Sequence, residues 1–285
     1  MLKKDGHTHT KFSHHGTDEA LPAYLQQALE LGFQTYVVTE HFPFPARFLQ
    51  TSVLPKKVLA SSAMHADELA TYQHTVTACK QAFKHQIQVQ QGFEIDYLAD
   101  YEAEIWDQLQ PCLPWIEEVV ISVHFLKNQQ GEFVPIDYSP EILATEMPEI
   151  KQDQQSFFQQ YFATIRQSLR FATQFPQAVT VRVGHLTLIH KYQKYFKFPA
   201  FNEQTNNELH QTLQLIKQLG FEVDLNTAGL RKEFNGEPYP NLTIIRQCQN
   251  LQIPLVFGSD AHQSADVGFA YNQFSQYLSL KEEGK

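Results

Sequence analysis

Side chains that could bind metal ions recur at the ends of short apolar runs along this chain. The first run ends in His7-Thr8-His9, and the last ends in Asp260-Ala261-His262. Residues two apart on a strand point to the same side, so each of these pairs can converge on one ion. Four further runs end in single residues of the same kind, which are His41, Glu94, His124 and His185. This distribution predicts a metal site that holds more than one ion.

Strands are the elements that must carry these residues, because the preceding runs are rich in valine, isoleucine and leucine, as buried parallel strands are. We predict strands over residues 4–9, 35–40, 87–94, 118–123, 179–183, 222–226 and 254–258. Segments with helical periodicity alternate with them, over residues 18–31, 63–84, 101–109, 150–174, 203–219, 242–250 and 265–280.

Regular alternation of strands and helices fits either a closed barrel or an open doubly wound sheet. In an open sheet the site forms at one switch point, whereas candidate ligands here follow nearly every predicted strand. We therefore predict an α/β fold, a distorted seven-stranded (β/α)7 TIM-like barrel with the site at the carboxyl ends of its strands. No linker or composition break divides the sequence, so we expect one domain over residues 1–285.

The composition limits the classes of partner. A net charge of −9 argues against non-specific electrostatic binding of nucleic acid, because such binding depends on clustered Lys and Arg. A small anionic substrate stays compatible, since bound cations reverse the local sign. No stretch approaches the about 20 apolar residues of a membrane helix, and the start leads directly into the first predicted strand, so we expect neither a membrane segment nor a signal peptide.

The cysteines are few and far apart. Cys79, Cys112 and Cys248 predict neither a disulfide framework nor a zinc site of paired cysteines. We expect buried, inert thiols in a cytoplasmic protein, and the sequence indicates no obligate protein partner. Imidazole and carboxylate ligands without thiolate indicate a catalytic site for zinc, iron or manganese rather than structural zinc.

Six strings at these strand ends carry a family resemblance. They are HTHTKFSHHG, VVTEHFPFP, GFEIDY, ISVHFL, VGHLTL and SDAH, in order from His7 to His262. Together they resemble the polymerase and histidinol phosphatase (PHP) family, and within it the monofunctional histidinol-phosphate phosphatases. The resemblance covers about the whole chain and implies a distorted (β/α)7 barrel with metal ions at its mouth.

The resemblance also implies how the ligands divide among three divalent ions, with zinc favoured over iron or manganese. The first ion would take His7, His9, Glu94 and Asp260, the second His15, His41 and His262, and the third Glu94, His124 and His185. Glu94 would then bridge two ions. Of the neighbours His14 and His15 we expect one ligand, His15, because Gly16 allows a turn that presents it inward.

The activity implied by the resemblance is hydrolysis of L-histidinol phosphate to L-histidinol and phosphate in histidine biosynthesis. Neighbouring divalent ions suit this reaction because one lowers the pKa of a water while others bind phosphoryl oxygens. We expect direct attack by metal-bound hydroxide, since no activated Ser, Cys or Asp nucleophile is readable apart from the ligands. The predicted catalytic residues are Glu94, Asp260, His262 and Arg231.

Arg231 is the predicted phosphate donor, because the planar guanidinium binds phosphate bidentately. It lies in the string DLNTAGLRKEF, which resembles the NTSGLRK-type segment of histidinol phosphatases and places Asn226 at the barrel mouth. Lys191 is a weaker phosphate candidate. The alternative for Arg231 is a surface salt bridge on a solvated loop.

A substrate with an imidazole and an amine needs an aromatic surface and a carboxylate besides the metal ligands. We expect Phe42 to contact the ring, with Phe44 and Phe125 as further candidates, and Asp137 to meet the ammonium. The alternative is that these aromatics only pack the loops. Glu40 could either orient a histidine or contact the substrate.

Three other functions remain open. A nuclease or proofreading role, acting on nucleic-acid ends, is disfavoured by the acidic charge and by the lack of a polymerase region. A catalytically inert module is disfavoured because every ligand position of the family is filled. A phosphatase of the same fold that acts on other small phosphates, such as sugar or nucleotide phosphates, can be separated only by testing substrates.

Overall fold

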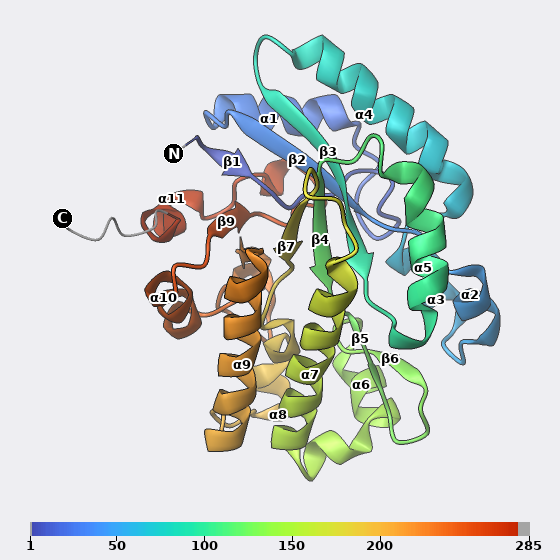
Figure 1. Cartoon of the computed structure of the whole chain (residues 1–285), viewed down its shortest axis with the longest axis vertical. Helices are drawn as coiled ribbons and strands as arrows, with labels where there is room; N and C mark the ends of the chain where they lie inside the picture. The colour runs from blue at the N-terminus through green and yellow to red at the C-terminus, as the bar shows by residue number, and fades with distance from the viewer. Residues whose placement is uncertain (1, 279–285) are drawn as a thin grey trace.

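The computed structural model describes residues 2–278 of the chain. Its main sheet has seven parallel strands in the order β1-β2-β3-β4-β7-β8-β9, at the centre of Figure 1. The strands are β1 (Lys4–Asp5), β2 (Thr35–His41), β3 (Gln88–Asp96), β4 (Glu118–Ser122), β7 (Thr180–Val183), β8 (Glu222–Asn226) and β9 (Leu255–Gly258). Each overlaps one of the strands expected from the sequence.

The first and last strands come together and nearly close the sheet into a barrel. The Gly6 N–H donates to the carbonyl of Phe257 at 2.8 Å, and the His9 N–H donates to that of Ala261 at 2.9 Å. Thr8 forms an isolated parallel bridge with Ala261. The predicted distorted (β/α)7 barrel is therefore confirmed. The strand β1 is shorter than predicted, although Thr8 beyond it still accepts from the Thr39 N–H of β2 at 2.9 Å.

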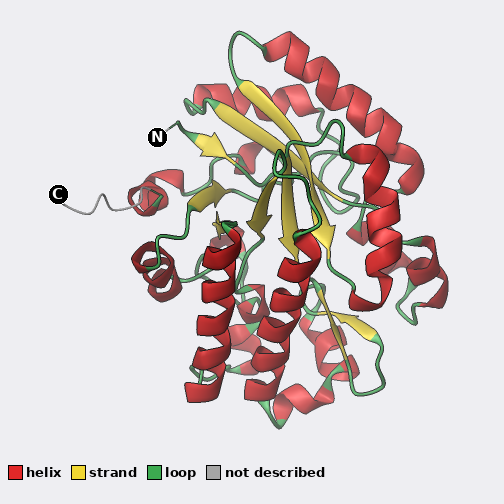
Figure 2. Cartoon of the chain, viewed as in Figure 1, coloured by secondary structure: helices red, strands yellow, loops and turns green. Residues whose placement is uncertain are grey.

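Helices surround the strands, as Figure 2 shows with helices in red and strands in yellow. They are α1 (Leu21–Glu30), α2 (Ala46–Thr51), α3 (Lys56–Ser62), α4 (Leu69–Phe83), α5 (Glu102–Leu109), α6 (Pro140–Glu146), α7 (Gln154–Ala172), α8 (Gln193–Phe196), α9 (Glu203–Leu219), α10 (Leu242–Asn250) and α11 (Tyr271–Phe274). Between residues 2 and 278, none is both long and apolar enough to cross a bilayer.

Amphipathic sequence and capping residues explain the longest helices. Asp153 caps α7 by accepting from the N–H of Ser156, and Asn202 caps α9 by accepting from that of Thr205. Gly220, with a φ of 69°, ends α9. The two helices lie side by side in Figure 1 and pack against each other, and α7 also packs against β4 of the sheet.

Two predictions about elements were wrong or incomplete. The helix expected over residues 265–280 is broken within the described residues into short turns and α11, because Gly268 and Ala270 have positive φ values of 67° and 59°. The rest of that segment, from residue 279, lies outside the described residues. The segment between residues 124 and 149, for which no strand or helix was predicted, contains the hairpin β5 (Phe125–Lys127) and β6 (Phe133–Pro135), followed by α6.

The amino-terminal end of the barrel is closed by a buried ionic network rather than by apolar side chains alone. Arg182 on β7 is 1% exposed and donates to the carbonyl of Gly6 and to the carboxylates of Glu118 and Glu222. Lys4 pairs with the same Glu118. Arg182 therefore ties β1, β4 and β8 together beneath the residues that could bind metal.

Candidate metal centre

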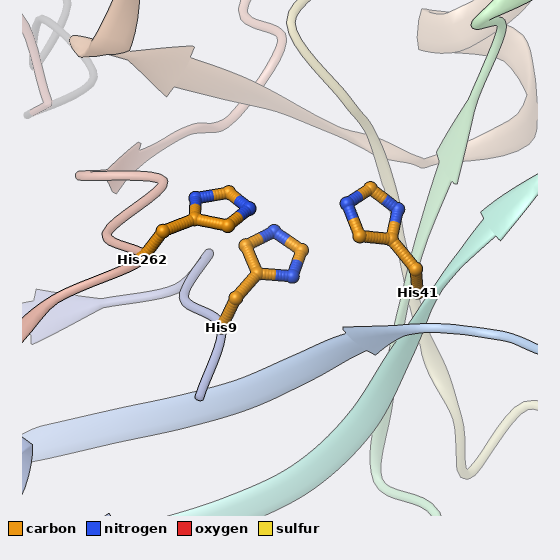
Figure 3. Close-up of side chains that lie close together, drawn as sticks. All are labelled: His9, His41 and His262. Carbon is orange, nitrogen blue, oxygen red and sulfur yellow. The ribbon is translucent and has the colours of Figure 1, made fainter. Parts of the chain in front are cut away.

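The predicted ligands gather at the carboxyl ends of the strands, on one side of the barrel. Figure 3 shows His9 between His41 and His262. His9 comes from the segment after β1, His41 ends β2, and His262 comes from the segment after β9. The ring centroids of His9 and His262 are 4.2 Å apart, and those of His9 and His41 are 4.5 Å apart. Segments far apart in the sequence thus present imidazole nitrogens to a common centre, as predicted.

One group of ligand atoms surrounds Oε2 of Glu94. The Nε2 atoms of His7 and His9 lie 3.2 and 3.4 Å from this oxygen. They lie 3.2 Å from each other, and His9 Nε2 lies 3.3 Å from Oδ1 of Asp260. Two ligands on a tetrahedral zinc are separated by about 3.3 Å, given bonds of about 2.0–2.1 Å. The spacing in this group therefore fits one shared ion.

A second group surrounds Oε1, the other oxygen of Glu94. His185 Nε2 lies 2.8 Å from it and His124 Nε2 lies 3.5 Å from it, and these two nitrogens are 3.0 Å apart. Three lone pairs that converge this closely repel one another unless a cation or proton lies among them. Glu94 is thus placed to share its two oxygens between two ions, the bridging position implied for it.

The remaining imidazoles lie beside His262. His41 Nδ1 is 3.2 Å from Oε2 of Glu94, and the ring of His15 is 4.5 Å from that of His262 and 5.2 Å from that of His41. Ligand atoms of His9, His41 and His262 lie within 4.8 Å of one another. The geometry therefore brings together His15, His41 and His262, the ligands implied for the second ion, and His9 lies closer to them than the resemblance implied.

His14 and His15 point in different directions. The Gly16 N–H donates to the carbonyl of Ser13 at 2.8 Å, which makes the expected tight turn. His15 Nδ1 donates to the carbonyl of Ser61 at 2.7 Å, which leaves Nε2 free as a ligand atom. His14 turns away and contacts Glu68 at 2.7 Å. The turn thus presents His15, and not His14, to the cage.

Charges in the cage favour ionised carboxylates. Burial opposes ionisation of Glu94, but His7, His41 and His124 outweigh it and hold the pKa of this carboxyl well below its usual range. Burial also opposes a charge on His124, yet Asp96 and Glu94 raise the pKa of its imidazole to about 10. The cage is therefore a site for positive charge, and a divalent cation would displace the protons from its histidines.

Buried partners orient several of the ligands. Asp224 Oδ2 lies 2.7 Å from Nδ1 of His7, and Asp96 contacts Nδ1 of His124, so each ring presents Nε2 to the cage. The Ser122 hydroxyl donates to Glu94 at 2.6 Å. Neither Asp224 nor Asp96 was predicted from the sequence, although each lies two residues from a predicted site residue on the same strand.

Glu40 and Asn226 also support ligands. Glu40 is fully buried, accepts from the N–H and hydroxyl of Thr10, and lies 3.8 Å from Nδ1 of His9. This position favours the orienting alternative for Glu40. The Asn226 amide donates to Asp260 at 3.1 Å and to Asp224 at 3.0 Å. Its side chain is thus occupied by protein partners and does not line the cavity described below.

A cavity of about 350 Å³ opens above the cage. Its wall includes the candidate ligands His15, His41, Glu94, His124, His185, Asp260 and His262, with Asp96, Phe125, Asp137, Lys191, Arg231, Lys232 and Tyr239 among the other residues. The loops after β2, β4, β7, β8 and β9 therefore all contribute to one concave site, as functional loops of a barrel do.

Comparison with known proteins identifies the family. The family model described as the PHP domain matches residues 5–228, and the one described as PHP-associated matches residues 238–282. The chain belongs to the PHP family. The barrel takes strands from both matched regions, since β9 lies in the second and pairs with β8 of the first.

Two similar proteins match this chain over nearly their full length. A histidinol-phosphatase of Bacillus subtilis is 35% identical over 274 residues, which are 96% of this chain and 98% of that protein. The solved structure of a candidate histidinol phosphatase from Listeria monocytogenes has a TM-score of 0.89 and 32% identity, covering 95% of this chain and all of that one. The family and the fold expected from the sequence are therefore confirmed.

A third similar protein is the histidinol phosphate phosphatase of Lactococcus lactis, solved in complex with zinc, L-histidinol and phosphate. It has a TM-score of 0.62 and 16% identity, covering 96% of this chain and 93% of that one. At this identity the likeness supports the PHP barrel fold alone.

Phe42 does not lie where the sequence analysis expected. It is 2% exposed, packs edge-on against Phe93 in the core, and is absent from the cavity wall. The cause is local: Phe42 continues β2 beyond His41, and its N–H donates to the carbonyl of Glu94 at 2.8 Å. Phe44 is likewise buried against Phe48, so Phe125 is the phenylalanine that the cavity wall offers.

The charged substrate candidates all lie on the cavity wall. Arg231 Nη2 donates to the carbonyls of Ser259 and Asp260 at 3.0 and 3.4 Å, which places the guanidinium beside the metal ligands. Its Nε also lies 3.7 Å from Asp266. Lys191 pairs with Asp137 at 3.1 Å, so these two expected contacts neutralise each other in the chain itself.

Proposed function

We propose that this chain is a histidinol-phosphatase, which hydrolyses L-histidinol phosphate to L-histidinol and phosphate in histidine biosynthesis. The observation that carries the proposal is the position of Glu94, whose two oxygens face two separate groups of histidines at the floor of one cavity. The full-length relative from Bacillus subtilis, named a histidinol-phosphatase, supports the choice of substrate.

The cage would hold three divalent ions, with zinc favoured and iron or manganese as alternatives. The first ion would be bound by His7, His9, Glu94 and Asp260. The third would be bound by Glu94, His124 and His185. His15, His41 and His262 would take the second, with His9 near enough to share it. Such ions lower the pKa of a bound water and neutralise phosphoryl oxygens.

The chain's own residues would bind and orient the phosphate ester. Arg231 is held beside Asp260 by one edge of its guanidinium, which leaves Nη1 available for a phosphoryl oxygen. Lys191 and Asp137 pair with each other in the chain, and the substrate would exchange for this pair: its ammonium would meet Asp137, and the Lys191 ammonium would then face the phosphate. Phe125 replaces Phe42 as the surface for the imidazole ring. Asn226 would act through Asp260, which it holds in place.

A cytoplasmic location fits this proposal. The described cysteines are all free and buried, as the sequence analysis expected, which suits a reducing compartment. The reaction as proposed needs only the small phosphate ester, water and metal ions. Neither a nucleic acid nor a protein partner has a role in it.

Phosphate release from L-histidinol phosphate tests the proposal, beside glucose 6-phosphate, AMP and a 3′-phosphorylated oligonucleotide. We expect the purified protein, loaded in turn with zinc, manganese or iron, to prefer L-histidinol phosphate in kcat/KM by at least about a hundredfold, because imidazole, ammonium and phosphate each find a partner. Equal or higher kcat/KM for a sugar phosphate, a nucleotide or the oligonucleotide would replace the proposed substrate.

Arg231→Ala tests the phosphate contact within that assay. We expect kcat/KM to fall by a factor of tens, on the scale of one charge-assisted hydrogen bond. Arg246→Ala is the matched control, since Arg246 is exposed on α10 and absent from the cavity wall. An unchanged kcat/KM in Arg231→Ala would remove Arg231 from the proposed site.

A further inference from the structure

The cavity wall contains polar atoms that the protein leaves without partners. Five of its residues carry a buried side-chain nitrogen or oxygen with no hydrogen-bond partner among residues 2–278. Three are the cage histidines His41, His185 and His262. Metal ions would account for His41 Nδ1 and His262 Nε2, whereas the unpaired atom of His185 is Nδ1, and its Nε2 is the atom that faces Glu94. The other two are Arg231, through Nη1, and Tyr239, through its hydroxyl. Buried donors are nearly always paired, so these two indicate an acceptor that enters the cavity.

Tyr239 is fixed in position. Its N–H and carbonyl exchange hydrogen bonds of 2.8 Å with those of Asn226, at the end of β8. The side chain is 1% exposed, and its ring stands edge-on to His185 with the centroids 6.5 Å apart. Gly229 lies directly against the ring, where even a methyl group would approach Cε2 to 2.8 Å. The hydroxyl therefore cannot swing away to find a partner elsewhere.

The surroundings of Tyr239 favour an anionic acceptor. Burial, together with Asp137 and Asp260, raises the pKa of the phenol well above its usual value, so the hydroxyl keeps its proton at neutral pH. Lys191, Arg231 and Lys232 line the same cavity. A ligand group that accepts from a guanidinium and from a phenol in this wall is an oxyanion rather than an ammonium.

We propose that Tyr239 is a substrate-binding residue whose hydroxyl donates a hydrogen bond to a phosphoryl oxygen of the phosphate monoester. This inference rests on the proposed phosphatase function and deepens it. Tyr239 and Arg231 would hold the phosphoryl group from the wall, while the cage at the floor holds it from the other side. Because the contact is to the phosphate, it serves any monoester that the cavity admits.

Tyr239→Phe removes only the hydroxyl, and Tyr36→Phe is a matched control. The Tyr36 hydroxyl is also fully buried and without a hydrogen-bond partner among the described residues, but Tyr36 does not line the cavity. Three quantities are measured: kcat/KM for L-histidinol phosphate, kcat/KM for p-nitrophenyl phosphate, and the inhibition constant of inorganic phosphate. Thermal midpoint and metal content report whether each variant is folded and loaded.

For Tyr239→Phe we expect kcat/KM to fall by about ten- to a hundredfold on both substrates, and the inhibition constant of phosphate to rise about tenfold, as for a hydrogen bond to a charged group. The thermal midpoint should not fall, because the lost hydroxyl has no partner in the protein. Tyr36→Phe should match the parent protein in all three quantities.

An unchanged inhibition constant of phosphate in folded, metal-loaded Tyr239→Phe would overturn the inference, whatever happens to turnover. If that variant does not fold, Tyr239→Leu, which also lacks the hydroxyl, is measured in the same way. The p-nitrophenyl phosphate and inorganic phosphate measurements do not depend on L-histidinol phosphate. The contact of Tyr239 with phosphate can therefore be confirmed even if L-histidinol phosphate is not the substrate. Equally, L-histidinol phosphate can be the substrate even if Tyr239 does not contact phosphate.

Discussion

Glu94 is the residue on which the proposed chemistry depends most. It is 1% exposed, and its two carboxylate oxygens face different groups of histidines. An amide at this position has one oxygen and one NH2 group, and the NH2 group cannot bind a cation. The charge that holds the cage together would also be lost.

Glu94→Gln should therefore lower both metal content and turnover. We expect at least one ion fewer per chain and a fall in kcat of at least about a hundredfold, since the bridging ligand is lost. Metal analysis after gel filtration, beside a phosphate-release assay, measures both. Glu104→Gln is the control, since Glu104 lies on α5, is half-buried and is absent from the cavity wall. Full metal content with parental kcat in Glu94→Gln would show that Glu94 is no bridge.

Asp224 acts on the cage through His7 and has no place in the cavity wall. Asp224→Asn should weaken metal binding by about 10- to 100-fold, because the amide no longer fixes the His7 ring through a charged acceptor. Competition with a chelator of known zinc affinity measures the change. Asp107→Asn, on the surface of α5, is the control and should leave the zinc affinity unchanged. An unchanged zinc affinity in Asp224→Asn would contradict the role of His7 as a ligand.

At this scale the candidate ligands were easier to predict from the sequence than the residues around them. His and Glu at the ends of apolar runs are unusual enough to be noticed one at a time. Asp96 and Asp224 could also have been predicted, because side chains two apart on a strand share a face. Asp96 is two residues from Glu94, and Asp224 is two residues from Asn226. The burial of Phe42 and the unpaired hydroxyl of Tyr239 depend on how loops pack, which local sequence does not determine.

Among the elements, β3 and β4 must approach closely enough to carry Glu94 and Ser122 side by side. Gly92 pairs with Glu118 in the ladder between them. A methyl group at Gly92 would collide with the backbone carbonyl of Glu118, which cannot move without breaking the ladder. Glycine is required here for close approach of two backbones, two residues before Glu94.

Gly92→Ala should therefore destabilise the fold by about 2–3 kcal/mol or more, as overpacking in a closed sheet does. Gly131→Ala is the comparison, because nothing lies within 4 Å of the added methyl and only its φ of 82° opposes the change. That variant should cost about 1 kcal/mol. Urea unfolding measures both, and equal losses would contradict the close approach of β3 and β4.

Hydrophobic runs and helical periodicity predicted the seven strands of the barrel and most of its helices, because burial imposes both patterns. The hairpin of β5 and β6 was not predicted, since its strands are three residues long and too short for a pattern. The helix expected after His262 was wrong because left-handed backbone at Gly268 and Ala270 interrupts an otherwise helical pattern.

The molecule as a whole buries its cysteines in different parts of the core. Burial raises the pKa of the Cys112 thiol to about 11 and that of Cys248 to about 12, and it also raises the pKa of Cys79. Only the thiolate reacts with alkylating reagents. These pKa values lie above that of an exposed cysteine. The three buried thiols should therefore become reactive only at a higher pH than an exposed cysteine does.

The folded protein should accordingly resist iodoacetamide at pH 8, while the urea-unfolded chain should take up label at all of Cys79, Cys112 and Cys248. Mass spectrometry after timed exposure counts the labels. Rapid labelling of a thiol at pH 8 in a protein that stays folded would show that this part of the core opens to solvent.

The central claim is that barrel closure brings scattered histidines and acids into one metal cage that hydrolyses phosphate esters. Titration of zinc into the metal-free protein, with binding followed by calorimetry and phosphate release from L-histidinol phosphate in parallel, tests it directly. We predict that about three equivalents of zinc bind, and that turnover appears only as the cage fills. Full turnover in the presence of excess chelator, at less than a tenth of an ion per chain, would contradict the claim.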